Sequence, residues 1–285
     1  MSKVAIITDS IACLPRDILE QYEIHLVTPN IYFDGKVYRD WLDISPSEVY
    51  QLLETAPHLF STSAPPPADF VQAYRSLSSN AESILCITLS SKVSTVYNAA
   101  LLAREQVQKE SGYAHIEVLD SQTVTGAEGF VVLAAARAVA EGRGLVEAVE
   151  AAKEVRAKVD LVFVLETIRH VYRTGRVPKV ASRLGAWLNV KPVLTWENGV
   201  ARFIGMTRSK EKGVNQLLEA MHKRVGAKPV HVAVHHADAP EEGERLVERM
   251  RAEFECVQLW LTEFSPIMGY STGSGALGVA FYAED

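Results

Sequence analysis

Short apolar runs alternate with amphipathic stretches through the first half of the chain. The apolar runs predict buried strands at 4–8, 24–28, 83–89 and 116–119. The stretches between them carry apolar residues at helical spacing and predict helices at 14–22, 65–77, 94–109, 126–141 and 145–158. Strands that alternate with helices of this length are typical of a parallel α/β sheet.

Two local signals add detail to this half. Asp34-Gly35 lies between β-forming residues and predicts a hairpin over 31–38. Ser45-Pro46-Ser47-Glu48 predicts a helix start, with a serine cap, a proline in the first turn and a glutamate at the third position.

The second half is less regular and predicts a different kind of sheet. Strands are expected at 161–165, 230–235, 257–262 and 278–282, and helices at 209–225 and 240–253. Asn198-Gly199 predicts a second hairpin within 191–207, and 170–183 is short, basic and turn-rich. We therefore predict two domains, a parallel three-layer α/β domain over 1–159 and an α/β domain of α+β type with a mixed sheet over 160–285.

Composition restricts the partners that this chain is expected to have. The 29 basic and 35 acidic residues among 285 give a net charge of −6, which argues against nucleic acid or an anionic membrane as the main partner. No apolar run approaches the length of a membrane span, so stable membrane insertion is not expected. Cys13, Cys86 and Cys256 are odd in number and far apart, which fits a reducing cytoplasm and no metal cluster.

Two turns rich in hydroxyl groups are the first candidate site. One contains Thr62 and Ser63, and the other contains Ser91, Ser94 and Thr95. Each is expected to open a helix, and the two are expected at one edge of the same sheet. Unpaired backbone amides and the helix dipole favour an anion there, although helix capping alone explains such residues as well.

Two acidic pairs follow predicted parallel strands and form the second candidate. Asp9-Ser10 and Asp120-Ser121 are expected in the crevice at the carboxyl ends of the strands. An aspartyl nucleophile would make the protein a phosphotransferase or hydrolase, but the second acid that such chemistry needs does not follow Asp9. Capping of the next helix or loop is the favoured interpretation.

Other motifs carry weaker signals. The chain has no G-x-S-x-G elbow, and its histidines assign no catalytic triad. His235 and His236 point to opposite faces of a strand, which favours structural roles over a metal site.

Residues 269–278 are rich in glycine and hydroxyls and suit either a ligand head group or a tight turn. A local basic patch either forms a solvated face or binds an acidic partner. Its residues are Arg169, Arg173, Arg176, Lys179 and Arg183.

Several motifs in their order along the chain resemble the DegV family nearly from end to end. They are Thr8-Asp9-Ser10, Thr62-Ser63-x-Pro65, Ser90-Ser91-x-x-Ser94-x-x-Tyr97-x-x-Ala100, Leu119-Asp120-Ser121, Gly175-Arg176-Val177, the run 188–194 and the glycine-rich end. Each motif alone is weak, but their joint order and spacing are specific.

The resemblance implies a protein that is not an enzyme and has no cofactor. Proteins of the family bind one long-chain fatty acid, such as palmitate, between two α/β domains, for lipid transport or for presentation to an ATP-dependent kinase that makes an acyl phosphate. It implies that Thr62 and Ser94 hold the carboxylate and that the second domain forms much of the acyl-chain tunnel. Further contacts are expected from Ser63, Thr95, Ser271, Gly275 and Ala276, and docking of the kinase from Arg173 and Arg176.

This chain departs from the family pattern in three segments, at 94–97, at 174–176 and at 271–275. Ser271 stands where the family commonly has a histidine that can contact the carboxylate, so an uncharged hydroxyl replaces an imidazole. Three hypotheses follow from the sequence: a fatty-acid-binding protein, a phosphotransferase or hydrolase that uses Asp9 or Asp120, and a regulatory protein that binds a partner through residues 169–183.

Overall fold

The computed structural model describes residues 3–110, 112–176 and 190–284. The chain forms two compact units, the first from 1–43 with 58–157 and the second from 44–57 with 158–285. The chain thus passes to the second unit at 157/158, whereas the sequence predicted a boundary at 159/160. The segment 44–57 also belongs to the second unit, although the sequence placed it in the first domain.

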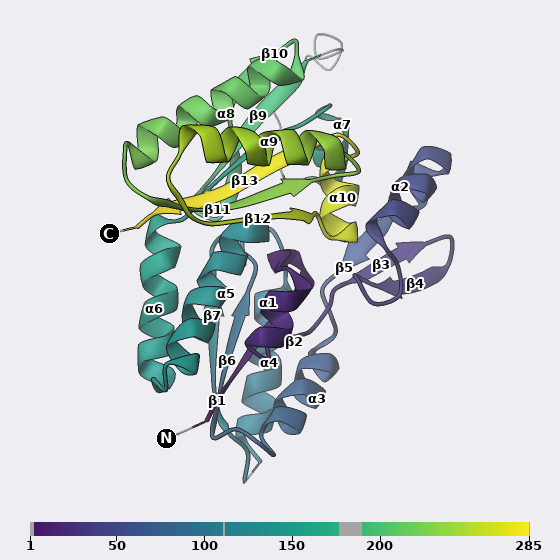
Figure 1. The fold of residues 1–285 in the computed structure, drawn as a ribbon. Helices are drawn as coiled ribbons and strands as arrows, with labels where there is room; N and C mark the ends of the chain where they lie inside the picture. Colours follow the sequence, from purple (N-terminus) through teal and green to yellow (C-terminus); the bar gives the residue numbers. More distant parts are fainter. Residues whose placement is uncertain (1–2, 111, 177–189, 285) are drawn as a thin grey trace. The chain divides into compact units, whose positions relative to one another are not determined.

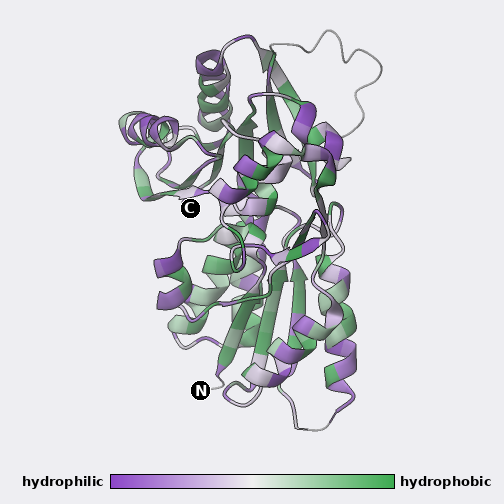
Figure 2. Ribbon diagram, turned by 90° about the vertical axis from the view of Figure 1, so that its right-hand side faces the viewer, coloured by the Kyte–Doolittle hydropathy of each residue, from purple (hydrophilic) through white to green (hydrophobic). Residues whose placement is uncertain are grey.

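A four-stranded parallel sheet with the order β2-β1-β6-β7 forms the centre of the first unit (Figure 1). Its strands are β1 (Val4–Thr8), β2 (His25–Leu26), β6 (Ser83–Thr88) and β7 (His115–Asp120). The α-helices of this unit are α1 (Arg16–Gln21), α3 (Pro67–Leu77), α4 (Val96–Gln108), α5 (Thr125–Ala140) and α6 (Leu145–Lys158). Figure 2 shows the apolar strands of this sheet with helices on both sides, which confirms the predicted three layers.

The central strands explain why the sheet is parallel. Ile84, Leu85, Cys86 and Ile87 of β6 are all fully buried, so the strand is covered on both faces. Such continuous apolar runs are typical of parallel strands between two helical layers. The buried strands predicted from 4–8 and 83–89 are therefore confirmed.

A separate three-stranded antiparallel sheet, of order β4-β3-β5, belongs to the same unit. It consists of β3 (Asn30–Phe33), β4 (Lys36–Arg39) and β5 (Ser61–Ser63). Asp34 and Gly35 form the β3–β4 turn with φ values of 47° and 73°, the left-handed conformation that a tight hairpin of this kind requires. The hairpin predicted over 31–38 is confirmed.

The second unit contains a six-stranded mixed sheet with the order β10-β9-β8-β13-β11-β12. Its strands are β8 (Asp160–Val164), β9 (Lys191–Glu197), β10 (Val200–Thr207), β11 (Val230–His236), β12 (Cys256–Glu263) and β13 (Leu277–Ala283). The pair β11–β12 is parallel, and the other four neighbouring pairs are antiparallel. This is the mixed sheet that the sequence predicted.

Two long helices cover one face of this sheet (Figure 1). They are α8 (Lys210–Val225) and α9 (Pro240–Glu253), and their apolar residues form one core with those of β8, β11 and β13. The shorter helices of the unit are α2 (Pro46–Thr55), α7 (Arg169–Thr174) and α10 (Pro266–Thr272). Ser45 and Glu48 form the predicted capping box at the start of α2.

An aromatic cluster, formed by Phe163, His235 and Phe264, gives the second unit a further buried contact. The ring centroids of Phe163 and Phe264 are 5.9 Å apart, and His235 stacks on Phe264 with centroids 5.2 Å apart. Gly278 of β13 makes room for this cluster, because a Cβ atom there would lie 2.8 Å from Phe264 Cζ. The histidine thus has the structural role that the sequence favoured, and burial lowers its pKa to about 3.

Candidate functional site

Three neighbouring strands of the parallel sheet end at the same edge. The strands β1, β6 and β7 are adjacent and parallel, so the residues that follow them lie close together: Asp9, Leu89 and Ser121. This is the edge at which open α/β sheets bind ligands. The loop of residues 89–95, which leads from β6 to α4, lies in the middle of it.

Asp120 holds the middle of this loop. The Ser91 hydroxyl donates to Asp120 Oδ2 at 2.5 Å, and the Ser91 amide donates to Oδ1 at 3.3 Å. The Gln122 amide donates to the same Oδ1 at 2.8 Å. Asp120 therefore fixes two loops at once, as the capping interpretation predicted.

Asp9 holds the start of the same loop. Its Oδ2 accepts the Leu89 amide at 2.9 Å, and its Oδ1 accepts the Ile11 amide at 3.0 Å. The side chain is fully buried, and each of its oxygens accepts a backbone amide. These contacts are those of a structural cap, the interpretation that the sequence favoured over an aspartyl nucleophile.

Ser94 lies at the end of this loop, directly before α4. Its hydroxyl oxygen accepts the Val96 amide at 3.4 Å, and the residue is half-buried. Because this bond uses the oxygen, the hydroxyl hydrogen can be donated to a ligand. Thr95 occupies the cap position without a side-chain capping bond, and it is exposed. The prediction that this turn opens a helix is confirmed.

Thr62 lies elsewhere in the first unit than the sequence suggested. It is the central residue of β5 and pairs with Ile31 of β3, so the turn prediction for this segment was wrong. The two hydroxyl-rich segments also belong to different sheets, since β5 is not part of the parallel sheet. Thr62 is half-buried, while the neighbouring Ser63 hydroxyl already contacts Ala64 O at 3.0 Å and Tyr32 Oη at 3.3 Å.

The three candidate residues of the second unit have polar partners within that unit. The Ser271 hydroxyl donates to Ile267 O at 2.9 Å, inside α10. The Gly275 amide donates to Ala237 O at 2.7 Å, and Ala276 O accepts the Ala237 amide at 2.9 Å. Residues 266–272 form the helix α10, so the first part of the loop or turn predicted over 269–278 is helical, and Ser265 caps this helix by accepting the Met268 amide.

The helix α7 carries Arg169 and Arg173 of the predicted basic patch, and Arg176 follows its C-cap Gly175. Arg173 lies over the ring of Tyr270, with its Cζ 4.9 Å from the ring centroid, and also contacts His170 Nδ1 at 3.2 Å. Burial lowers the pKa of Arg176. Lys179 and Arg183 lie outside the described residues.

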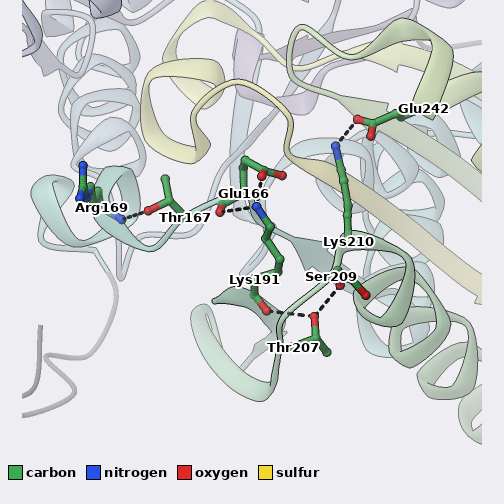
Figure 3. Close-up of polar contacts among 8 residues, drawn as sticks. All are labelled: Glu166, Thr167, Arg169, Lys191, Thr207, Ser209, Lys210 and Glu242. Atoms are coloured by element: carbon green, nitrogen blue, oxygen red, sulfur yellow. Dashed lines mark hydrogen bonds and ion pairs between the residues drawn. The ribbon is translucent and has the colours of Figure 1, made fainter. Parts of the chain in front are cut away.

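Polar contacts anchor the segment that leads from β8 to α7 (Figure 3). Lys191 of β9 forms an ion pair with Glu166 and donates to the Glu166 carbonyl at 3.4 Å. The Arg169 amide donates to Thr167 Oγ1 at 3.3 Å. These bonds fix the start of α7 to the mixed sheet.

Sequence reasoning missed one residue of the first unit, Glu128. It lies in the first turn of the largely apolar helix α5, and it is fully buried. Its Oε1 accepts the Thr8 hydroxyl at 3.4 Å, and its carboxyl contacts that of Asp9. A lone glutamate within an apolar helix was the signal that could have found it.

Residues 3–110, 112–176 and 190–284 contain neither a candidate metal cluster nor a candidate membrane span. Within these ranges, no group of three or more His, Cys, Asp or Glu side chains is placed to hold a metal ion. None of the helices in the same ranges combines the length and apolar character needed to cross a bilayer.

The fold and the candidate edge define a class of two-unit α/β proteins with a parallel and a mixed sheet. The model of a family described as "Uncharacterised protein, DegV family" matches residues 3–284. A DegV domain-containing protein of Caldanaerobacter subterraneus is 32% identical over 282 residues, which cover 99% of each chain. The chain belongs to the DegV family, as its motifs indicated.

Solved structures of relatives share this fold over their whole length. The fatty-acid-binding DegV family protein of Thermus thermophilus has a TM-score of 0.89 and 26% identity, with full coverage of both chains. DegV of Bacillus subtilis, a fatty acid binding protein, has a TM-score of 0.88 and 26% identity, also with full coverage. A stearic acid-binding protein of Eubacterium ventriosum has a TM-score of 0.88 and 25% identity, covering 99% of this chain and 98% of the other.

Proposed function

We propose that this protein binds one long-chain fatty acid and that the hydroxyls of Thr62 and Ser94 hold its carboxylate. The observation that carries the proposal is the full-length similarity to three proteins described as binding fatty acids, one of them stearic acid. The family motifs that contain Thr62 and Ser94 support the choice of these two residues.

The geometry of the first unit supports Ser94 as a carboxylate ligand. It is half-buried at the start of a 13-residue helix, where the helix dipole favours a negative charge. Asp9 and Asp120 fix the loop before it through bonds to Leu89 and Ser91. A ligand therefore meets a hydroxyl whose position is set before binding, which reduces the entropy that binding costs.

Simple energetics favour a lipid over a small anion. A sixteen-carbon acid buries about fifteen carbons beyond its carboxyl, worth roughly 12 kcal/mol at about 0.8 kcal/mol per CH₂. Loss of free motion and ordering of the tail cancel several kcal/mol of this. The remainder allows roughly micromolar or tighter binding, for which two neutral donors suffice to orient the head group.

The ligand can be identified without assuming its chain length. Native mass spectrometry of protein purified from cells is expected to show one acyl chain per protein, and the extracted acid gives its length and unsaturation. Delipidated protein is expected to bind stearate, palmitate or oleate again at micromolar concentration or below. A protein that carries no acyl chain and has no affinity for these three acids contradicts the proposal.

A second part of the proposal concerns presentation of the bound acid to an ATP-dependent kinase through Arg173 and Arg176. The position of Arg173 in the basic helix α7 and of Arg176 two residues after its end supports it, because cationic surfaces steer acidic partners. Reversal of both charges to glutamate is expected to lower acyl phosphate formation with such a kinase about tenfold at unchanged fatty acid affinity. Reversal of the exposed Lys223 and Lys228 serves as the control, and equal loss in both double variants contradicts the assignment.

A further inference from the structure

Two fully buried carboxyl groups contact each other at the centre of the first unit. Asp9 follows β1 and Glu128 lies in α5, and both side chains have 0% exposure. The Glu128 carboxyl lies at the end of β1, where its Oε1 accepts the Thr8 hydroxyl at 3.4 Å, and it interacts with the Asp9 carboxyl. Two ionised carboxylates this deeply buried would repel each other, so the pair needs to hold a proton.

The neighbouring groups determine which carboxyl carries that proton. Both oxygens of Asp9 accept backbone amides, from Ile11 and Leu89, and such bonds favour the ionised form. Glu128 Oε1 accepts the Thr8 hydroxyl, whereas no donor among the described residues reaches Glu128 Oε2. A protonated Oε2 supplies its own donor and makes the contact to Asp9 favourable.

Among the described residues, the charges that act on the pair come from acids, Asp40 on Asp9 and Asp120 on Glu128. The titratable groups that face the pair from the packed elements are Asp40 after β4, Cys86 of β6, Asp120 of β7 and, through Cys86, Tyr74 of α3. Burial keeps the thiol neutral by raising its pKa to about 12.

We propose that Asp9 and Glu128 share one proton, carried by Glu128, and that this pair positions the Leu89 amide and with it the loop that ends at Ser94. Asp9 is then a positioning residue, since it acts on Ser94 through the loop backbone. The importance of Ser94 as a ligand rests on the proposed function, whereas the shared proton does not. Burial raises the pKa of Asp9 to about 7 and that of Glu128 well above its usual range, in agreement with the proposal.

The sign of the pH effect follows from these raised pKa values. The unfolded chain releases both protons near pH 4, whereas the folded protein keeps one at neutral pH. The stabilisation by the pair is therefore complete below about pH 4 and is lost as the pH rises through 7 and above. Histidines with a lowered pKa, such as His25 in the same unit, act in the opposite direction, so wild type must be compared with a variant.

The variant Glu128→Gln tests the shared proton without changing the size of the side chain. Its amide donates to Asp9 at any pH and carries no ionisable proton, so position 128 no longer titrates. Between pH 5 and 9, the free energy of unfolding is expected to fall more steeply with pH in the wild type than in the variant. The two slopes against pH are expected to differ by the amount that corresponds to about one proton. The exposed Glu154→Gln is the matched control and is expected to keep the wild-type slope. Equal slopes for wild type and Glu128→Gln would overturn the proposal.

The loop is tested by two further measurements. Between pH 6 and 9, the hydrogen-exchange protection of the Leu89 amide is expected to fall at least threefold more in wild type than in Glu128→Gln. The affinity for stearate is expected to show the same difference between the two proteins. Equal changes in both proteins overturn the positioning role. If the wild type binds no stearate, the proposed function is contradicted. The pH dependence of the free energy of unfolding and the exchange protection of the Leu89 amide still test whether the two carboxyls share a proton. If Glu128→Gln does not fold, the wild type must show the infrared carbonyl band of a protonated carboxyl at pH 7, and absence of that band overturns the proposal.

Discussion

Replacement of Thr62 and Ser94 together by alanine is expected to weaken fatty acid binding by about 2–5 kcal/mol, which is about 30-fold to several thousand-fold. In the proposed complex each hydroxyl donates to a charged carboxylate, and such bonds are worth more than those between neutral groups. The tail keeps its apolar contacts in the variant, so residual binding remains. Titration of delipidated protein with stearate, followed by calorimetry, measures the loss.

A matched double variant one residue away tests the choice of these two side chains. Ser63→Ala with Thr95→Ala removes the same hydroxyl types from the same two segments. The Ser63 hydroxyl is bonded to Ala64 and Tyr32, and Thr95 is exposed, so this variant is expected to stay within about threefold of wild type. If it loses as much affinity as the first variant, or if the first variant binds normally, the assignment of Thr62 and Ser94 is wrong.

Replacement of Phe264 by alanine is expected to lower the free energy of unfolding by about 3–5 kcal/mol. The ring is fully buried and packs on Phe163 and His235, and Gly278 approaches it closely. Loss of this ring leaves a cavity against β8, β11 and β13 of the mixed sheet, which cannot close it. Urea unfolding, followed by circular dichroism, gives the change in the midpoint and in the free energy.

Two controls separate the cavity from a general effect of substitution. Phe264→Leu keeps most of the apolar volume and is expected to cost less than half as much. Leu102→Ala removes a side chain that is 57% exposed and is expected to change the free energy by less than about 0.5 kcal/mol. A loss below about 1 kcal/mol for Phe264→Ala would show that this cluster is not part of the stabilising core.

Local chemistry explains which elements the sequence predicted well. The helix over 240–253 begins at Pro240 and has the predicted bounds, because its apolar face and its ends are encoded in neighbouring residues. The hairpin of β9 and β10 turns at Asn198-Gly199, where both residues have positive φ. In such segments the determining contacts lie within a few residues of each other.

Elements that depend on distant partners were not predictable in the same way. The strand β5 has three polar residues and no apolar alternation, and it forms because β3 offers backbone partners some thirty residues away. The helix α10 was hidden by its glycine and hydroxyl content, although Ser265-Pro266 is a recognisable helix start. Composition outweighed the capping signal in that case.

The candidate site likewise contains residues whose roles follow from nearby sequence and residues whose roles depend on distant partners. Asp9 and Asp120 were expected as caps because each follows an apolar strand, and their bonds to backbone amides confirm this role. Glu128 was not expected, since its contact with Asp9 arises only when α5 packs on β1. The roles of Thr62 and Ser94 stay a proposal that rests on the family motifs.

The placement of residues 44–57 in the second unit has a consequence for synthesis of the chain. The helix α2 is made early, but its packing partner α10 leaves the ribosome roughly 210 residues later, which takes about 10 to 40 s at ordinary translation rates. During this interval the apolar face of α2 with Val49, Tyr50 and Leu53 has no permanent cover. The second unit therefore completes its folding only after nearly the whole protein has been made, and a fragment that begins at 158 would lack one of its helices.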